Sequence, residues 1–538
     1  MCPNPSPMIT KRAPYNLRLG PHRPAVDKAL AQIHRQRLIQ RIWDEDHTVW
    51  RHDPTEIADR LGWLTVTDAM WPQVRSLETF ALAVREEGIQ HVVLLGMGGS
   101  ALGPDVLQRT LGPTPGFPQL LVLDSTVPAA IKATLDIIEP SRTLFLVSSK
   151  SGTTLETLTI YSFFRAKVEE SVGKADAGKH FVAITDPGTP LVSLADEQNF
   201  RRAFLNPPDI GGRYSVLSYF GLVPAALAGY NLERLLDQAD TMRRATGADV
   251  PADANHAAWL AALMAALSMQ GRDKLTLVAS PSIEPFGLWI EQMLAESSGK
   301  DGKGIIPVTG EPLMPPAVYS DDRFFINLRS GPDDTASSRA LQSLARAGHP
   351  IATLDIPDPY ALGAEFFCWE LATAIACALL SVHPFDQPNV QQAKDMANRL
   401  LKEGSNRDMP STTPGASSVQ SLLQNVSPGD YLAILAYLPA SPPVHSALTV
   451  IRRRITEKYR IATCLGYGPS YLHSTGQLYK GGPPRGPIPL HHRRRRPGPL
   501  HPGPGLHLRR LSQHPGPRRP GRPPGPRPPH RPYPPPPR

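Results

Sequence analysis

Residues 91–107 read HVVLLGMGGSALGPDVL, and this stretch decides the fold class. A short apolar run leads into a glycine-rich turn, and the turn is followed by a pattern typical of a helix. Apolar runs of this kind that alternate with helices form parallel sheets covered by helices on both faces. The stretch therefore predicts a strand, turn and helix of a doubly wound α/β domain.

The same pattern repeats further along the chain. Three further apolar runs end in turns rich in Gly, Ser or Thr: LLVLDST (120–126), TLFLVSSKSGTTLET (143–157) and HFVAITDPGT (180–189). A second series predicts strands at 274–280, 323–329 and 350–356, with helices at 257–269, 282–298, 361–381 and 388–402. We therefore expect two α/β domains, with a boundary near residues 241–254.

The remaining segments are shorter. Residues 24–50 have apolar side chains at helical spacing and are expected to form a surface helix. Two strand candidates, 431–438 and 460–468, flank an Arg-rich helix at 446–459. We expect an N-terminal extension and helix at 1–55, a first domain at 56–245, a second at 246–405, a C-terminal α/β segment at 406–482 and a disordered Pro/Arg-rich tail at 483–538.

The charge of the chain is divided unevenly. The 538 residues contain 57 Lys and Arg against 48 Asp and Glu, and the pI is about 9.4. The tail alone contains 13 Arg, no acidic residue and 21 of the 60 prolines, so the other 482 residues have a net charge of −4. The basic pI is therefore no sign of a nucleic-acid partner for the body. The tail is either a basic arm for RNA or another polyanion, or the product of a frame change in a G+C-rich gene.

Other classes of protein are disfavoured. No run reaches the 18 uninterrupted apolar residues of a membrane span, and the N-terminus lacks the apolar core of a signal peptide. The four cysteines show no disulfide framework or zinc-ligand spacing. We expect a cytoplasmic protein that needs no metal, cofactor or membrane.

Two loops have the composition of an anion site. GMGGS (96–100) joins a strand to a helix, where glycines either admit an anion to free backbone N–H groups or merely relieve steric crowding. SSKSGTT (148–154) places five hydroxyl residues, a lysine and a glycine in seven positions, and helix capping explains only one or two of those hydroxyls. The carboxyl ends of two strands in one sheet are the usual ligand edge of such folds, so the loops predict a phosphate site.

Three later motifs carry charged candidates. Arg213 follows two glycines in DIGGRYSVLS and is either an inward-facing cation or an ordinary surface charge. Glu296 lies at the end of the helix WIEQMLAESSGK, where a general base is possible. In HPFDQPNVQQAK, a helix is expected to begin at Pro388, with Gln387 as its cap and Lys394 nearly two turns later on the same side. Both residues are either functional or ordinary residues of the helix surface.

In this order, GMGGSALGP, SSKSGTTLET, GGRYS, AESSGK and PFDQPNVQQAK resemble the glucose-6-phosphate isomerase family, built from two sugar-isomerase (SIS) domains. The likeness is to the isomerase half of bacterial transaldolase/phosphoglucose isomerase fusion proteins and extends from about residue 16 to 482. No segment resembles a transaldolase barrel. After residue 482 the family continues with a further globular stretch, whereas this chain runs into PRGPIPLHHRRRR, so we expect an exposed sheet edge there.

The resemblance implies a role for each matching residue. Glu296 would move the proton between C2 and C1, and Arg213 would stabilise the enediolate. Lys394 is associated with ring opening, Gln387 with substrate contact, and the phosphate and neighbouring hydroxyls would be held by Gly99, Ser100, Ser149, Lys150, Ser151 and Thr154. The ring-opening histidine would be His473 in YLHSTGQ, with His383 as the alternative, and either could instead be a structural histidine.

The function implied is cofactor-free interconversion of glucose 6-phosphate and fructose 6-phosphate through a cis-enediol, in glycolysis and gluconeogenesis. The family also implies a homodimer and no specific nucleic-acid partner. Three alternatives stay open: an isomerase that also accepts mannose 6-phosphate, a non-catalytic sugar-phosphate-binding SIS protein, and an RNA-binding protein acting through the Arg/Pro arm.

Overall fold

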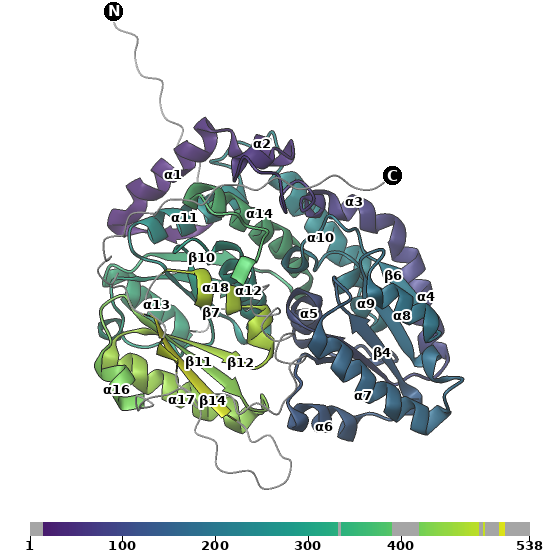
Figure 1. Ribbon diagram of the computed structural model, residues 1–538. Coiled ribbons are helices and arrows are strands. Elements are labelled where there is room, and N and C mark those ends of the chain that lie inside the picture. The colour runs from purple at the N-terminus through teal and green to yellow at the C-terminus, as the bar shows by residue number, and fades with distance from the viewer. Residues whose placement is uncertain (1–13, 332–334, 390–418, 484–487, 490–504, 512–538) are drawn as a thin grey trace, which may run out of the picture.

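The computed structural model describes residues 14–331, 335–389, 419–483, 488–489 and 505–511. Two α/β halves lie side by side, each built on its own sheet, and the N-terminal helices lie across one end (Figure 1). Lys394 and all but the first two residues of the helix predicted at 388–402 lie outside the described residues.

The first half contains a five-stranded parallel sheet in the order β3-β2-β4-β5-β6. Its strands are β2 (His91–Gly96), β3 (Gln119–Leu123), β4 (Thr143–Ser148), β5 (Phe181–Thr185) and β6 (Arg202–Leu205). The helices that cover its two faces include α4 (Val74–Glu86), α5 (Leu102–Leu111), α6 (Pro128–Ile137), α7 (Leu155–Val172), α8 (Pro190–Glu197) and α9 (Tyr219–Leu227). All six residues of β4 are buried, as the uninterrupted apolar run predicted. This half is the doubly wound domain expected from the sequence.

The second half repeats the same strand order on a smaller scale. Its sheet runs β1-β10-β9-β7-β8, and β7 (Lys274–Ala279), β8 (Ile306–Val308), β9 (Arg323–Arg329) and β10 (Ile351–Asp355) are parallel. The edge strand β1 (Asn16–Arg18) pairs antiparallel with β10. The prediction of two doubly wound sheets is confirmed, although the sequence reading missed β1, β6 and β8. Each of those strands has only three or four residues, too few for a periodic pattern.

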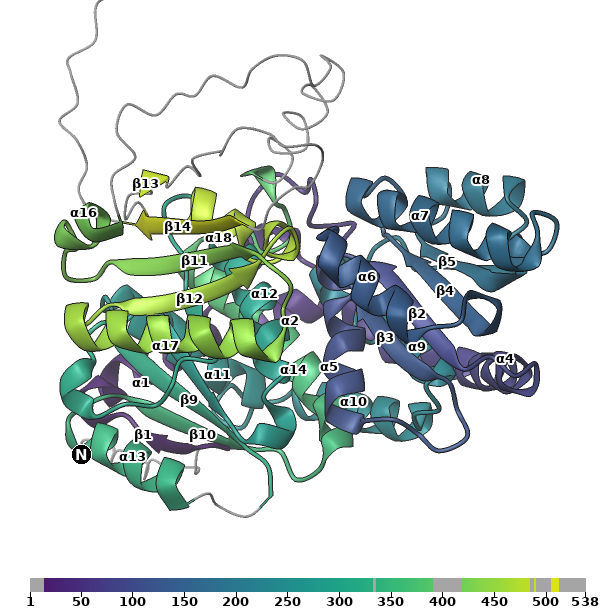
Figure 2. The same cartoon turned by 90° about the horizontal axis from the view of Figure 1, so that it is seen from below.

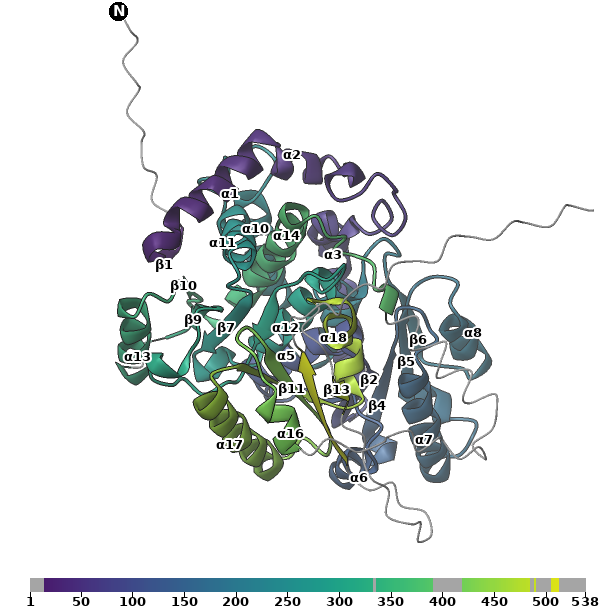
Figure 3. The ribbon, with the colours of Figure 1, turned by 60° about the vertical axis from the view of Figure 1, so that its left-hand side comes forward.

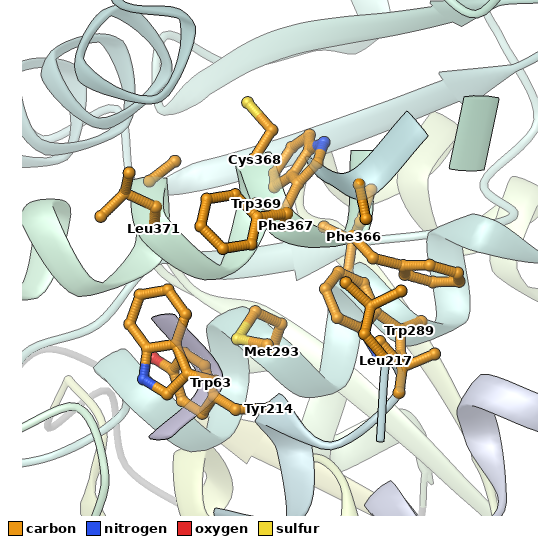
Figure 4. Close-up of a cluster of buried hydrophobic side chains, with 14 of the residues drawn as sticks. Trp63, Tyr214, Leu217, Trp289, Met293, Phe366, Phe367, Cys368, Trp369 and Leu371 are labelled. Atoms are coloured by element: carbon orange, nitrogen blue, oxygen red, sulfur yellow. The ribbon is translucent and has the colours of Figure 1, made fainter. Parts of the chain in front are cut away.

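A continuous apolar core joins the halves through α10 (Leu232–Ala245), α11 (His256–Met269), α12 (Phe286–Ser298) and α14 (Leu362–Leu380). The stretch Pro359–Leu380 is long and apolar enough to cross a membrane by length and composition, but 89% of its apolar window is buried inside the protein. Figure 4 shows its aromatic residues above Trp63 and Tyr214, whose rings lie 5.1 Å apart. This packing fixes Tyr214 and so anchors the neighbouring Arg213.

The N-terminal segment forms two helices instead of one. α1 (Arg23–Arg35) buries Val26 and Ile33 against α11, and α2 (Leu38–Trp43) follows directly (Figure 3). The chain turns between them at Arg37, whose φ of 52° is left-handed. A single helix over residues 24–50, as predicted, cannot pass through that conformation.

A third sheet has the order β12-β11-β14-β13 and lies against the second half (Figure 2). β11 (Tyr431–Tyr437), α17 (Pro442–Tyr459) and β12 (Ala462–Tyr467) form the strand, helix and strand expected from the sequence. The two strands pair in parallel, and α16 (Val419–Gln424) precedes them. After β12, the turn Ser470–His473 leads into α18 (Gly476–Gly481).

The structure differs from expectation at the edge of this sheet. β14 (Gly505–Leu511) pairs antiparallel with β11 along its whole length, and β13 (Ile488–Pro489) pairs with β14. The edge expected to be exposed is therefore covered by a strand from the tail. Residues 505–511 contain no proline, so every residue of this stretch has a backbone N–H that can donate to the ladder.

Candidate active site

A cavity of about 460 Å³ opens between the two halves, at the carboxyl ends of β2 and β4. Most of the residues predicted for the site gather there from separate parts of the chain. Its lining includes Gly99, Ser100, Lys150, Ser151, Thr154, Arg213, Glu296, Gln387 and His473, together with Arg60, Asp186, Thr189 and Gln292, which the sequence reading missed. The sheet edge predicted to bind a ligand therefore borders this cavity.

The glycines of GMGGS allow two other segments to approach closely. A Cβ on Gly98 would lie 2.3 Å from the carbonyl oxygen of His473, and Gly98 has a φ of 53°. A Cβ on Gly99 would lie 2.1 Å from the carbonyl oxygen of Gly212. Side chains at these two positions would push the His473 turn and the Arg213 loop out of place.

The second loop presents several hydroxyls ahead of helix α7. The hydroxyls of Ser149 and Thr154 lie 2.9 Å apart, and those of Ser151 and Thr153 are also 2.9 Å apart. Ser149 is 1% exposed and does not line the cavity, whereas Ser151 and Thr154 do. The loop therefore offers cavity-facing donors at a helix N-terminus, with Ser149 holding Thr154 from behind.

One corner of the cavity is charged. The ammonium of Lys150 contacts the Asp186 carboxylate and donates to the carbonyl oxygen of Pro208 at 3.0 Å. Burial raises the pKa of Asp186, and the hydrogen bond from Lys150 acts in the opposite direction. Lys150 is thus fixed at the rim of the hydroxyl loop.

Arg213 and Glu296 form the centre of the site. Arg213 is 4% exposed, and its Nη1 lies 3.3 Å from Oε1 of Glu296. It also donates from Nη1 to Oε1 of Gln387 at 2.8 Å and from Nη2 to the carbonyl oxygens of Pro384 and Asp386, each at 2.9 Å. The sequence left two interpretations of Arg213, an inward-facing cation or a surface charge, and the structure shows the inward-facing cation.

Gln292 connects Glu296 with the third part of the site. It lies one turn before Glu296 on α12, and its Nε2 donates to Oε2 of Glu296 at 3.1 Å and to the carbonyl oxygen of His473 at 2.9 Å. Both partners are acceptors, so the amide nitrogen must be the atom that faces them. The spacing of four residues along a helix was the sequence signal that could have identified Gln292.

The two candidate histidines occupy different places. His473 lines the cavity, and its Nε2 lies 3.0 Å from Oε1 of Glu156, in the first turn of α7. His383 does not line it: its Nε2 lies 3.2 Å from the carbonyl oxygen of Thr55, and its Nδ1 accepts from the backbone N–H of Phe385 at 3.1 Å.

Lys300 lies beside His383, and burial lowers the pKa of its ammonium to about 8. The ammonium donates to the His383 carbonyl oxygen at 2.5 Å and to Oδ1 of Asp386 at 2.7 Å. His383 and Lys300 thus support the loop that contacts Arg213.

This geometry agrees with what comparison with known proteins shows. Residues 70–305 match the family model for phosphoglucose isomerase. The chain is 32% identical over 366 residues to a glucose-6-phosphate isomerase of Rubrobacter xylanophilus, covering 59% of this chain and 84% of that relative. A glucose-6-phosphate isomerase of Parabacteroides distasonis is 30% identical over 398 residues, covering 64% and 88%. This chain belongs to the phosphoglucose isomerase family.

Solved structures agree with that membership at the level of the fold. A hypothetical protein from Thermus thermophilus superposes with a TM-score of 0.60 at 25% identity, covering 72% of this chain and 99% of that one. A glucose-6-phosphate isomerase from Chlamydia trachomatis gives a TM-score of 0.59 at 19% identity, covering 74% and 89%. The family model matches residues 70–305 and so does not include the Pro/Arg-rich tail, and neither does the resemblance seen in the sequence motifs.

Proposed function

We propose that the protein is a glucose-6-phosphate isomerase, which interconverts D-glucose 6-phosphate and D-fructose 6-phosphate in glycolysis and gluconeogenesis. The observation that carries the proposal is the buried pair of Arg213 and Glu296, which faces a hydroxyl-rich loop across one cavity. A carboxylate base beside a fixed cation is what proton transfer next to a carbonyl group requires. Membership in the phosphoglucose isomerase family supports the same reaction.

The phosphate would bind at the loops after β2 and β4. The side chains of Ser100, Lys150, Ser151 and Thr154 line that end of the cavity, beside Gly99, and Ser149 supports Thr154. Several donors together with the N-terminus of an 18-residue helix suit a dianion without a bound cation. This anchor would place C1 and C2 of the opened sugar near Glu296, across the cavity.

Glu296 would carry the proton between the two carbons. In the aldose-to-ketose direction its carboxylate removes the C2 proton, and the electron pair moves through a C1–C2 double bond to the C1 oxygen. The Arg213 guanidinium would stabilise the resulting cis-enediolate. A proton passes from the C2 oxygen to the C1 oxygen, and Glu296 returns its proton to C1. One carbon is reduced as its neighbour is oxidised, so the redox balance closes within the substrate.

Ring opening comes before this transfer. We assign it to His473, which lines the cavity and is held through Nε2 by Glu156. A carboxylate that fixes one imidazole nitrogen also sets the tautomer of the ring, and so the role of the other nitrogen. Gln387 would contact the sugar from the Arg213 side. The resemblance adds Lys394 to this step.

We further propose that the protein is a cytoplasmic homodimer, as the family resemblance implies.

A coupled assay tests the function. Glucose 6-phosphate formed from fructose 6-phosphate is measured with the wild-type chain, with Glu296→Gln and with the control Glu139→Gln, a carboxylate outside the cavity lining. We expect Glu296→Gln to lower kcat by about 10³ or more, since the base is removed while the shape of the site is kept. We expect the control to match the wild type. Binding of sugar phosphate without turnover by the soluble wild-type chain would contradict the proposal and favour a non-catalytic sugar-phosphate-binding protein.

A further inference from the structure

The turn that carries His473 belongs to the second half of the molecule but is fastened to the first. Residues 470–474 are only partly buried and connect two buried elements, the strand β12 and the helix α18. Within its own half the turn is packed through Tyr471, whose ring contacts those of Tyr437 and Tyr479. Its attachment to the first half depends instead on specific polar contacts.

Two carboxylates of the first half hold this turn. The hydroxyl of Ser470 donates to Oδ2 of Asp124, which directly follows β3. Three residues further along, Nε2 of His473 contacts Glu156. The partners are 346 and 317 residues apart in the sequence, so both contacts bridge the two halves of the molecule.

The inner side of the turn is fixed as well. The His473 carbonyl oxygen accepts the hydrogen bond from Gln292 and lies against Gly98, where a Cβ would approach to 2.3 Å. Because contact on this side is so close, the turn cannot move toward the cavity. The remaining movement is outward, away from the first sheet, and the Ser470–Asp124 hydrogen bond resists it.

Asp124 and Glu156 have different relations to the histidine. Glu156 touches the imidazole itself, whereas Asp124 touches Ser470 and does not line the cavity. Burial raises the pKa of Asp124, while the hydrogen bond from Ser470 and the charge of the nearby His473 act in the opposite direction. The Asp124 carboxylate is thus stabilised chiefly by its contact with Ser470 of the turn.

We propose that Asp124, through Ser470, is a positioning residue for His473, and that it sets the rate of ring opening without affecting proton transfer by Glu296. This inference rests on the proposed isomerase function and on His473 as the ring-opening group. Without the Ser470–Asp124 contact, the turn can move outward and the imidazole leaves hydrogen-bond reach of the ring oxygen. A displacement of about 1 Å is enough to cost a large factor in rate.

The test separates ring opening from proton transfer by the choice of substrate. Fructose 6-phosphate closes to a furanose through its C5 hydroxyl, whereas 5-deoxyfructose 6-phosphate lacks that hydroxyl and stays open. The kcat and KM of the full chain are measured for both substrates by proton NMR of the products. The variants are Asp124→Asn, Ser470→Ala and Ser470→Thr, and the control is Asp136→Asn, an exposed carboxylate that pairs with Lys132.

We expect Asp124→Asn and Ser470→Ala to lower kcat for fructose 6-phosphate about tenfold and kcat for the 5-deoxy substrate less than twofold. Ser470→Thr keeps the hydroxyl and should retain most of the activity, and Asp136→Asn should match the wild type. An equal loss on both substrates, or no loss on either, would overturn the proposal. If the wild-type chain turns over neither substrate, the proposed isomerase function itself fails, a result distinct from failure of the positioning role.

Discussion

At the residue scale, the charged groups of the site are held in place by contacts within the protein. Arg213 is held by two backbone carbonyl oxygens and by Gln387, so its cation needs little rearrangement to face a developing anion. Replacing it by lysine keeps the charge but loses the planar set of donors. We expect Arg213→Lys to lower kcat in the coupled assay by about 10²–10³ with a smaller change in KM. A fall in kcat of less than threefold would show that charge alone suffices.

The sequence singled out individual residues of the cavity only where a motif surrounded them. Arg213, Glu296 and His473 stand in recognisable motifs, and the structure brings all three to one cavity. Asp186 was missed because its partner Lys150 lies 36 residues away and is brought to it only by the fold. For Gln292 the spacing of four residues from Glu296 was visible in the sequence, but its second partner, the His473 carbonyl oxygen, is supplied by the fold.

At the element scale, helix α14 contains a buried acid that should make stability depend on pH. Burial raises the pKa of Glu365 to about 7, so between about pH 4.5 and 7 the folded chain binds more protons than the unfolded chain. The free energy of unfolding should therefore fall as pH rises through that range, by at most about 3 kcal/mol from this group. Urea unfolding at pH 5 and pH 7.5 should show a smaller fall for Glu365→Gln than for the wild type, with the exposed Glu170→Gln as control. An identical fall in all three chains would contradict the burial argument.

The third sheet offers a second test at this scale, because its edge depends on the tail. β14 covers β11, and an uncovered β11 would present unpaired backbone groups to other chains. A chain that ends at Leu511 keeps β14, whereas a chain that ends at Gly482 loses it. We expect size-exclusion chromatography to show aggregates for the shorter chain and the full-length elution behaviour for the longer one. Equal elution of both truncated chains as a single soluble species would show that β14 protects nothing.

At the scale of the whole molecule, the sequence predicted the two parallel sheets because buried strands alternate with helices over long distances. It could not predict that β14 pairs with β11 in the third sheet, since β14 lies in a segment whose composition favours disorder. Nor could it show that the Ser470–His473 turn joins the halves, which depends on contacts across more than 300 residues. The cavity is thus a product of assembly: each half supplies an incomplete site, and the C-terminal turn completes it.

The central claim is that Glu296, in this cavity between the halves, carries a proton between C1 and C2 of a hexose phosphate. Proton NMR of glucose 6-phosphate in deuterium oxide with the full chain tests it most directly, because removal of the C2 proton is seen as deuterium replaces it. We predict that the wild-type chain replaces the C2 proton while forming fructose 6-phosphate, and that Glu296→Gln does neither although it still binds the substrate. Deuterium exchange by Glu296→Gln at the wild-type rate would contradict the account.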